Sequence, residues 1–210
     1  MDIDRLLDEK KVQLFVKRIF DIVASGIGLI ILFIPMLVIA IFIKLDSKGE
    51  ILFKQVRVGK NLENFKIFKF RTMVSDAPLK GKSITVGGDR RITKVGSFLR
   101  KTKLDEIPQL INVFIGDMSL VGPRPEVPEY VKLYDEDQLN VLKVRPGITD
   151  LASIEYRDES RVLAESENPE KAYIEEIMPK KLELNIEYIK NMGLLYDISL
   201  IFKTLAAIVK

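Results

Sequence analysis

The sequence predicts a small α+β domain, mostly helical with one short β-hairpin, attached by an N-terminal re-entrant membrane helix and by interfacial amphipathic helices. Residues 22–43 are uniformly apolar, residues 51–71 contain two runs of β-forming side chains, and much of the later chain has the spacing of amphipathic helices. The length after the apolar run suits one compact domain. We therefore divide the chain into a membrane segment, residues 1–44, and one domain, residues 45–210.

The apolar segment predicts a kinked membrane helix. Its 22 residues, from Ile22 to Ile43, carry no charge and include Pro35. A helix of this length is about 33 Å long, enough to cross the hydrocarbon core of a bilayer. Pro35 lacks an amide proton and its ring crowds the preceding turn, so we expect a break or kink near Ile34.

The charges beside this segment favour a helix that enters the membrane and turns back. Basic residues favour the cytoplasmic side, and they stand at both ends of the run: Lys10, Lys11, Lys17 and Arg18 before it, and Lys44, Lys48, Lys54, Arg57 and Lys60 after it. A spanning anchor kinked by proline is the commoner object on hydropathy alone. A cleaved signal peptide fits less well, because the run is too long and no small-residue cleavage site follows it.

The elements around this segment follow from local patterns. Residues 5–16 are loosely amphipathic and predict an interfacial helix before the membrane helix. Residues 51–58 and 65–71 predict a hairpin with a longer loop at residues 59–64. Residues 81–89 predict an open loop.

Residues 105–115 predict a helix, with Asp105 near its cap, Pro108 in the first turn and Gly116 at its end. Three prolines then enforce an extended stretch at residues 123–128. Short helices are expected at residues 129–134 and 137–143.

Asn168 and Pro169 predict the start of a long helix, which should bend at Pro179 and end near Gly193. Asp197 is expected to cap a final helix. The apolar face of that helix suits core packing, with a membrane interface as the alternative.

The composition restricts the chemistry. The chain has 33 basic and 30 acidic residues, with a basic excess in residues 54–103, so its basic half should face anions such as phosphates or anionic lipid. It has no cysteine and no histidine, which excludes disulfides, thiolate nucleophiles and histidine-based triads. Catalysis would depend on carboxylates, Lys, Arg, Tyr, Ser, Thr and a hard metal such as Mg²⁺.

Asp105 and Glu106 form the most chemically suggestive pair, because they begin a helix just after a basic run. Carboxylates are common in a first helical turn for structural reasons alone. An ionised carboxylate beside Mg²⁺ can also act as a nucleophile at phosphorus or as a metal ligand. Arg100 is the nearest candidate for holding phosphate oxygens, and a solvated basic face is the alternative reading of that arginine.

The order of the motifs resembles the monotopic phosphoglycosyl transferases, also called bacterial sugar transferases, along nearly the whole chain. The residues that carry the resemblance are Lys17-Arg18 and Asp21, residues 53–59 (FKQVRVG), 68–73 (FKFRTM), 104–110 (LDEIPQL), 116–126 (GDMSLVGPRPE) and 145–149 (RPGIT). The length is similar to that of the family's minimal catalytic form.

The resemblance implies transfer of sugar 1-phosphate from a UDP-sugar to polyprenyl (undecaprenyl) phosphate, with release of UMP, as the first membrane step of glycoconjugate assembly. It assigns Asp105 as the nucleophile that forms a covalent phosphosugar intermediate and as a ligand of Mg²⁺. Glu106 would assist by orienting the site or handling a proton. The substrate-binding residues would be Arg100, Arg124, Lys69, Arg71 and Arg145.

The resemblance also implies a re-entrant anchor in the bacterial inner membrane, with the catalytic domain on the cytoplasmic face. Lys17, Arg18, Asp21 and Pro35 would form this anchor, and the three charged residues would pair with one another or with lipid headgroups. The expected partners are a UDP-sugar, polyprenyl phosphate and the bilayer, with a homodimer possible and no nucleic acid.

Two positions depart from the family pattern. Ile34 precedes Pro35 where the family often has serine, and Asp150 stands where many members carry glycine. Asp150 would either reshape the sugar pocket or join a surface ion-pair cluster. Two other functions stay open, a membrane-anchored metal-dependent phosphohydrolase and a non-enzymatic lipid-binding adaptor, and the sequence leaves the transferred sugar open.

Overall fold

The structure, a computed structural model, describes residues 3–77, 89–156, 162–163 and 165–209, so most of the loop expected at residues 81–89 lies outside the described residues. In chain order the helices and strands are α1 (Ile3–Glu9), α2 (Lys11–Asp46), β1 (Leu52–Val58), η1 (Lys60–Leu62), β2 (Asn64–Phe70), α3 (Lys94–Thr102), η3 (Leu104–Glu106), α4 (Gln109–Ile115), β3 (Ser119–Val121), α5 (Pro128–Val131), η4 (Gln138–Lys143), β4 (Gly147–Thr149), α6 (Leu151–Glu155), α8 (Pro169–Ala172), η5 (Tyr173–Ile177), α9 (Met178–Asn191) and α10 (Leu194–Val209).

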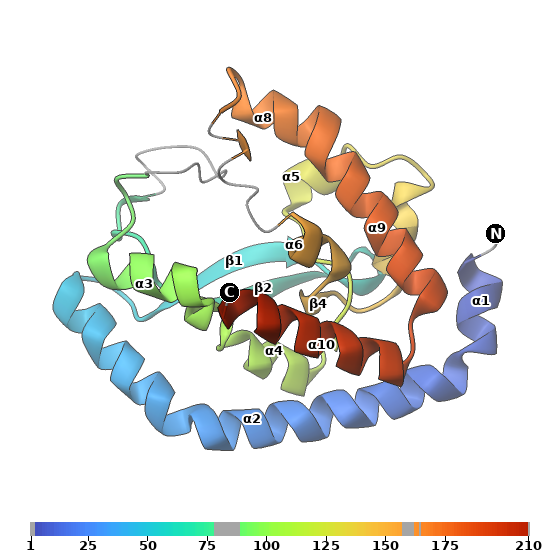
Figure 1. The fold of residues 1–210 in the computed structure, drawn as a ribbon, viewed down its shortest axis with the longest axis horizontal. Coiled ribbons are helices and arrows are strands. Elements are labelled where there is room, and N and C mark those ends of the chain that lie inside the picture. The colour runs from blue at the N-terminus through green and yellow to red at the C-terminus, as the bar shows by residue number, and fades with distance from the viewer. Residues whose placement is uncertain (1–2, 78–88, 157–161, 164, 210) are drawn as a thin grey trace.

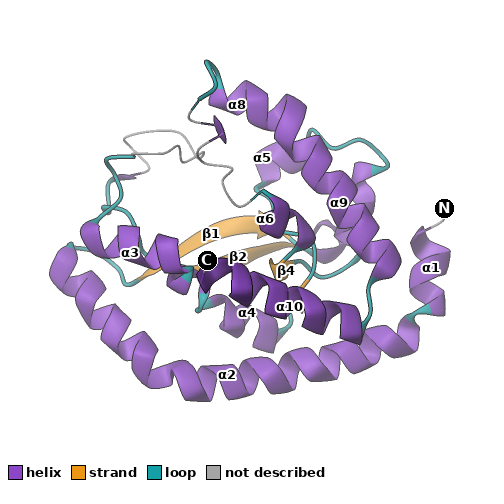
Figure 2. Ribbon diagram, viewed as in Figure 1, coloured by secondary structure: helices purple, strands orange, loops and turns teal. Residues whose placement is uncertain are grey.

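The prediction of a mostly helical chain with a small antiparallel hairpin is confirmed (Figure 2). Strands β1 and β2 pair from Leu52 opposite Phe70 to Val58 opposite Asn64, close to the expected bounds. The turn between them contains Asn61 and Leu62, both with positive φ, a conformation that asparagine tolerates better than most residues. In Figure 1 the hairpin lies in the middle of the molecule, with α2 on one side and α8 and α9 on the other.

A second, parallel pair of strands joins segments far apart in the sequence. Ser119 in β3 is opposite Gly147 in β4, and Val121 is opposite Thr149. The backbones approach very closely, since a Cβ on Gly147 would lie 2.1 Å from the nitrogen of Gly122. Glycine is therefore required at this crossing.

The apolar segment lies in one long helix. Helix α2 has 36 residues and continues through Pro35, so the helix is not broken there. Figure 1 shows α2 as a bent rod beneath the rest of the chain, with both ends rising toward it.

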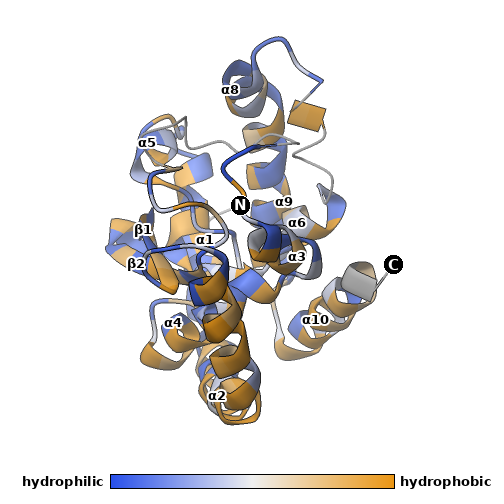
Figure 3. Ribbon diagram, turned by 90° about the vertical axis from the view of Figure 1, so that its left-hand side faces the viewer, coloured by the Kyte–Doolittle hydropathy of each residue, from blue (hydrophilic) through white to orange (hydrophobic). Residues whose placement is uncertain are grey.

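Many apolar side chains of α2 are exposed, and Figure 3 shows most of this helix in the hydrophobic colour at the lower edge of the molecule. Ile30 and Leu45 are each 78% exposed, and Ile31 and Ile34 are exposed as well. Among the described residues, α2 is the one helix long and apolar enough to cross a membrane. A water-soluble protein rarely exposes so large an apolar surface, so the structure favours membrane association.

The N-terminal half of α2 is fixed by a buried ion pair. The ammonium group of Lys17 lies 2.5 Å from Oδ2 of Asp197 in α10, and both side chains are nearly inaccessible to solvent. The hydroxyl of Tyr188 donates to the other oxygen of Asp197 at 2.8 Å and lies 3.1 Å from the carbonyl oxygen of Val121. This network connects the membrane helix to α9, α10 and β3.

Asp21 and Arg18 add two further contacts. Asp21 accepts hydrogen bonds from the hydroxyl of Ser119 at 2.8 Å and from the backbone N–H of Leu120 at 3.1 Å. Arg18 donates at 2.6 and 3.0 Å to two carbonyl oxygens near the C-terminal end of α4. The expected pairing of Lys17, Arg18 and Asp21 with one another is wrong for the described hydrogen bonds, because their observed partners all belong to the domain. The alternative, pairing with lipid headgroups, stays a prediction.

The C-terminal end of α2 is held by different groups. A carboxylate oxygen of Asp46 accepts a hydrogen bond from the backbone N–H of Val95, in the first turn of α3, at a distance of 3.0 Å. Arg71, after β2, donates to the carbonyl oxygen of Ser47 at 2.7 Å and to its hydroxyl at 3.0 Å. Both ends of the membrane helix are thus attached to the domain.

The long helix expected at residues 168–192 is confirmed as a continuous helical run made of α8, η5 and α9. Asn168 caps α8 by accepting from the N–H of Lys171, as its sequence predicts, but a π-helical turn, η5, then precedes α9. Pro179 occupies the first turn of α9. Since proline has no N–H to donate, the wider π turn absorbs the missing hydrogen bond.

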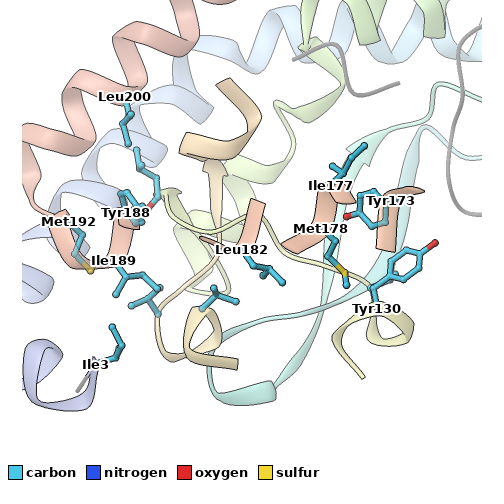
Figure 4. Packing of buried hydrophobic residues seen from close by; sticks show 14 of the residues in the cluster. Ile3, Tyr130, Tyr173, Ile177, Met178, Leu182, Tyr188, Ile189, Met192 and Leu200 are labelled. Carbon is cyan, nitrogen blue, oxygen red and sulfur yellow. The ribbon is translucent and has the colours of Figure 1, made fainter. Parts of the chain in front are cut away.

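The largest cluster of buried apolar side chains extends along η5 and α9. Figure 4 shows it running from Leu200 and Met192 at one end, past Leu182, to Tyr130 and Tyr173 at the other. The cluster fixes α9 and α10 against the segment that contains β3 and α5.

The last helix differs from its prediction in two ways. Asp197 lies within the first turn of α10 rather than before it, and its carboxylate binds Lys17 instead of capping the helix. Leu200 is fully buried, whereas Phe202 and Leu205, placed on the expected core face, are 66% and 53% exposed. Core packing therefore holds for only part of this helix.

We predict that Asp197→Asn destabilises the protein by about 3–5 kcal/mol, because the buried ammonium group of Lys17 loses its counter-charge. Chemical denaturation of the detergent-solubilised chain measures this change. In the double variant Lys17→Met with Asp197→Leu, which removes both charges, much of the stability should return. A single variant as stable as the parent would contradict the role of the pair.

Candidate active site

The candidate site is formed where helix α3 ends. The hydroxyl of Thr93 caps α3 by accepting from the N–H of Gly96 at 3.0 Å. A Cβ on Gly96 would lie 2.0 Å from the carbonyl oxygen of Thr72, so α3 packs directly on the chain that follows β2. Lys103 has a φ of 58° and ends the helix in the left-handed conformation. The chain then turns into η3, which contains Asp105 and Glu106.

Glu106 binds two cationic side chains at once. Its Oε1 accepts from the ammonium group of Lys69 and from a guanidinium nitrogen of Arg124, each at 2.7 Å. Burial by itself would raise the pKa of Glu106, but Arg124 and Lys69 outweigh it and hold the pKa well below its usual range. Glu106 is therefore ionised at neutral pH and fixes two cations beside Asp105.

Asp105 is the open carboxylate of the site. Asp105 is only 8% exposed. Its Oδ1 atom has no hydrogen-bond partner among the described residues. Burial, and then the charge of Glu106, raise the pKa of Asp105, while Lys69, Lys103 and Arg100 oppose the increase. A poorly solvated carboxylate with a free oxygen is suited to nucleophilic attack or to metal binding.

Arg100 lies near Asp105 at the end of α3. Its Nε donates to the hydroxyl of Thr72 at 2.8 Å, which orients the guanidinium group. Burial lowers the pKa of Arg100 and the nearby charge of Asp105 opposes this. Because the side chain is held through Nε, its terminal nitrogens are available to bind phosphate oxygens.

Arg124 is held in place by a second network that the sequence did not predict. Arg57 donates to the carbonyl oxygen of Pro125 at 3.0 Å and lies 3.2 Å from a carboxylate oxygen of Glu126. The hydroxyl of Tyr173 donates to the other oxygen of Glu126 at 2.5 Å. Arg57 and Glu126 lie within motifs noted in the sequence, but no sequence signal pointed to Tyr173.

Gln109 is a further residue that sequence reasoning did not place in the site. It is 1% exposed, and its amide nitrogen has no partner among the described residues. Gln109 follows Asp105 by four residues, at the start of α4. Buried polar groups without a partner are costly in a folded protein. The unpartnered amide nitrogen of Gln109 and the unpartnered Oδ1 of Asp105, four residues apart, are therefore consistent with a site for a polar substrate.

Two predicted substrate-binding residues make their described hydrogen bonds away from Asp105 and Glu106, and their role in binding substrate stays a prediction. Arg71 contacts the end of α2, as described above. Arg145 donates through Nε to the carbonyl oxygen of Gly116 at 2.8 Å, beyond the far end of α4. Neither makes a described hydrogen bond with Asp105 or Glu106, whereas Lys69, Arg100 and Arg124 are brought together as predicted.

Asp150 does not join a surface ion-pair cluster, because it is 1% exposed. It caps α6 by accepting from the backbone N–H of Ser153 at 2.7 Å, with a second, short contact from the Ser153 hydroxyl. A buried helix cap accounts for this carboxylate, and its other expected role, in the sugar pocket, stays a prediction.

The donor set is compatible with Mg²⁺ bound jointly by the protein and a substrate. No group of three or more acidic side chains suited to a metal occurs in the described residues. Asp105 has one free carboxylate oxygen, while Glu106 is engaged by two cations. Magnesium commonly uses one or two carboxylates together with substrate phosphates, and this mode matches the site.

Comparison with known proteins gives a family for nearly the whole chain. The family model described as bacterial sugar transferase matches residues 12–210. The chain is 36% identical over 210 residues to the exopolysaccharide production protein PSS of Rhizobium leguminosarum bv. phaseoli, covering 93% of this chain and 96% of that protein.

Two longer relatives carry more specific names. One is the UDP-N-acetylgalactosamine-undecaprenyl-phosphate N-acetylgalactosaminephosphotransferase of Aeromonas hydrophila, 38% identical over 203 residues, covering 92% of this chain and 44% of that protein. Another is the UDP-glucose:undecaprenyl-phosphate glucose-1-phosphate transferase of Escherichia coli (strain K12), 37% identical over 197 residues, covering 92% of this chain and 40% of that protein. This chain thus spans less than half of either protein. Together with the family match, these similarities show that the chain belongs to the bacterial sugar transferase family.

Proposed function

We propose that the protein transfers sugar 1-phosphate from a UDP-sugar to undecaprenyl phosphate and releases UMP. The observation that carries the proposal is the buried Asp105, whose free oxygen lies beside a set of fixed cations. The names of the Aeromonas and E. coli relatives, which state this class of donor and acceptor, support it. The name of the PSS relative includes exopolysaccharide production. We therefore propose that the transfer is the first step in the assembly of a polysaccharide.

In the proposed mechanism, a carboxylate oxygen of Asp105 attacks the phosphorus atom that bears the sugar. The bond between this phosphorus and the bridging oxygen breaks, and UMP leaves with that oxygen and the electron pair. An oxygen of undecaprenyl phosphate then attacks the same phosphorus and displaces Asp105, which regenerates the carboxylate. The covalent intermediate keeps the sugar phosphate on the enzyme between the two steps.

Arg100, Lys69 and Arg124 would stabilise the negative charge on the phosphate oxygens during both steps. Their fixed geometry matters, because an electrostatic group that is already oriented needs no reorganisation in the transition state. Glu106 is proposed as the residue that orients two of these cations. Its lowered pKa argues against a proton-transfer role, since it would hold no proton near neutral pH.

Asp105 would also be the protein ligand of Mg²⁺. When bound, the ion would supply charge neutralisation between the anionic nucleophile and the diphosphate of the donor. The protein's own cations supply part of the same neutralisation, and they bind the donor whether or not the ion is present.

We propose that α2 enters and leaves the same leaflet, with the domain on the cytoplasmic face of the inner membrane. The attachment of both ends of α2 to the domain supports this, because a straight spanning helix would carry one end to the opposite surface (Figure 1). The arrangement suits the chemistry, since a soluble donor and a lipid phosphate must meet at the level of the headgroups.

We predict that Asp105→Asn lowers UMP release from UDP-sugar and undecaprenyl phosphate by at least about 10³-fold, because the amide cannot act as the nucleophile. The assay uses the detergent-solubilised chain with Mg²⁺ and a panel of UDP-sugars. Asp137→Asn, an exposed aspartate outside the site, is the matched control and should retain parental activity. Release that does not require undecaprenyl phosphate would instead favour the phosphohydrolase.

Thermal unfolding of the same variant separates lost chemistry from lost fold. Because burial raises the pKa of Asp105, its ionised form destabilises the folded state at pH 7, and this cost decreases as the pH falls through the raised pKa. Asp105→Asn should therefore unfold at a higher temperature than the parent at pH 7, with a smaller difference at acidic pH. An inactive variant that unfolds at a lower temperature would leave loss of fold as the explanation.

We also predict that single cysteines placed at Lys10 and Lys48 both react from the cytoplasmic side of intact membrane vesicles. The chain has no native cysteine, so labelling with a membrane-impermeant maleimide reports each position without background. In the re-entrant arrangement, right-side-out vesicles should protect both positions and inside-out vesicles should expose both. Opposite labelling of the two positions would establish a spanning helix.

A further inference from the structure

A cationic cavity lies between the N-terminal part of α2 and the domain, apart from the site around Asp105. It has a volume of about 220 Å³. Its basic lining residues are Lys11, Lys17, Arg18, Lys60, Lys143 and Arg145. The acidic residues of the lining are Asp8 and Asp21. None of the residues that surround Asp105 and Glu106 contributes to it, so the cavity is a separate feature of the molecule.

Two guanidinium groups give the cavity its strongest charge. Arg18 and Arg145 both donate to carbonyl oxygens at the C-terminal end of α4, Arg18 near Val113 and Arg145 at Gly116. Their positive charges are close enough to repel each other. An anion bound between them would relieve this repulsion, and each guanidinium group has N–H groups beyond those used in its described hydrogen bonds, which phosphate oxygens could accept.

The other charges are partly balanced. Lys17 is neutralised by Asp197, Lys143 pairs with Asp4 at 2.7 Å, and Lys11 pairs with Asp8 at 3.1 Å. The latter two pairs are exposed, and exposed pairs contribute little and exchange easily with another anion. The cavity can therefore offer additional cationic groups to a ligand without breaking a buried interaction.

The position of the cavity indicates where such an anion would come from. It opens beside the first turns of α2, where Val12 and Phe15 are 76% and 67% exposed, just before the apolar segment begins. Leu7, Leu14 and Met192 provide apolar lining in the same cavity. Cationic and apolar groups side by side at the entry of a membrane helix match the boundary between a phosphate headgroup and an acyl chain.

We propose that this cavity binds the phosphate of an anionic membrane phospholipid, separately from the substrates of the transfer reaction. The bound headgroup would fix the N-terminal part of α2 and the end of α4 at the level of the membrane surface. The proposal rests on the membrane placement of α2 and not on the transfer chemistry, so UMP release from the same samples tests the two independently.

Native mass spectrometry of the full chain in a neutral detergent tests the proposal. Short-chain phosphatidylglycerol is the anionic lipid, short-chain phosphatidylcholine is the zwitterionic lipid, and inorganic phosphate is the free anion. We expect one phosphatidylglycerol to bind saturably, with much weaker binding of the other two. The double variant Lys60→Gln and Lys143→Gln should weaken phosphatidylglycerol binding by about tenfold.

The matched control is Lys132→Gln with Lys171→Gln, which removes the same charge from exposed positions outside the cavity. This control should bind phosphatidylglycerol as the parent does. Equal weakening in both double variants would show that only net charge matters and would overturn the proposal. Equal binding of phosphatidylcholine, or inorganic phosphate that binds as tightly as the lipid, would also overturn it.

The acceptor lipid requires its own comparison. The Lys60 and Lys143 double variant should keep the parental KM for undecaprenyl phosphate in the UMP-release assay, since the cavity shares no residue with the site around Asp105. A raised KM for this lipid with an unchanged KM for the UDP-sugar would assign the cavity to the acceptor and would overturn a separate phospholipid site.

Discussion

The carboxylate of Glu106 is the contact on which the candidate site depends. It joins three segments that are distant in sequence, because Lys69 belongs to β2, Arg124 to the proline-rich stretch after β3, and Glu106 itself to η3. A buried carboxylate requires compensation by cations or hydrogen bonds, and here two cations supply it. Since Glu106 takes this role, the neighbouring Asp105 keeps a free oxygen within the same positive environment. The two adjacent acids therefore have different environments, which match the different roles proposed for them, one in orienting cations and one in chemistry.

The membrane helix is integrated into this arrangement. Asp21 in α2 accepts hydrogen bonds from two residues of β3, the strand that precedes Arg124. Asp46 binds the start of α3, the helix that carries Arg100 and is followed by Asp105 in η3. A shift of either end of α2 would move an element that carries a site residue. The membrane segment is thus a structural part of the proposed active site, and the exposed apolar face of α2 would set the height of Asp105 above the bilayer.

Patterns of neighbouring residues predicted the elements that depend on neighbouring residues alone. The hairpin, the start of α8 at Asn168 and the long apolar helix are confirmed. Helix α3 was not predicted, because its apolar pattern is short. The three-residue strands β3 and β4 were not predicted either, because each pairs with a segment far away in the sequence. The helix cap expected at Asp197 and the surface cluster expected at Asp150 were wrong for a related reason, since burial and, for Asp197, a long-range partner decide the role of a carboxylate. Within the site, the resemblance predicted the grouping of Asp105, Glu106 and three cations. The described hydrogen bonds of Arg71 and Arg145 go to other segments, and Tyr173 lies in none of the motifs.

The most direct test of the account is to look for a sugar phosphate on Asp105. Purified protein would be incubated with Mg²⁺ and UDP-N-acetylgalactosamine or UDP-glucose in the absence of undecaprenyl phosphate, quenched, and analysed by peptide mass mapping. The account predicts one sugar-phosphate adduct on the peptide that contains Asp105, and its loss when undecaprenyl phosphate is added. A preparation that releases UMP in the presence of the lipid, but never carries an adduct or carries it on another residue, would contradict Asp105 as the nucleophile.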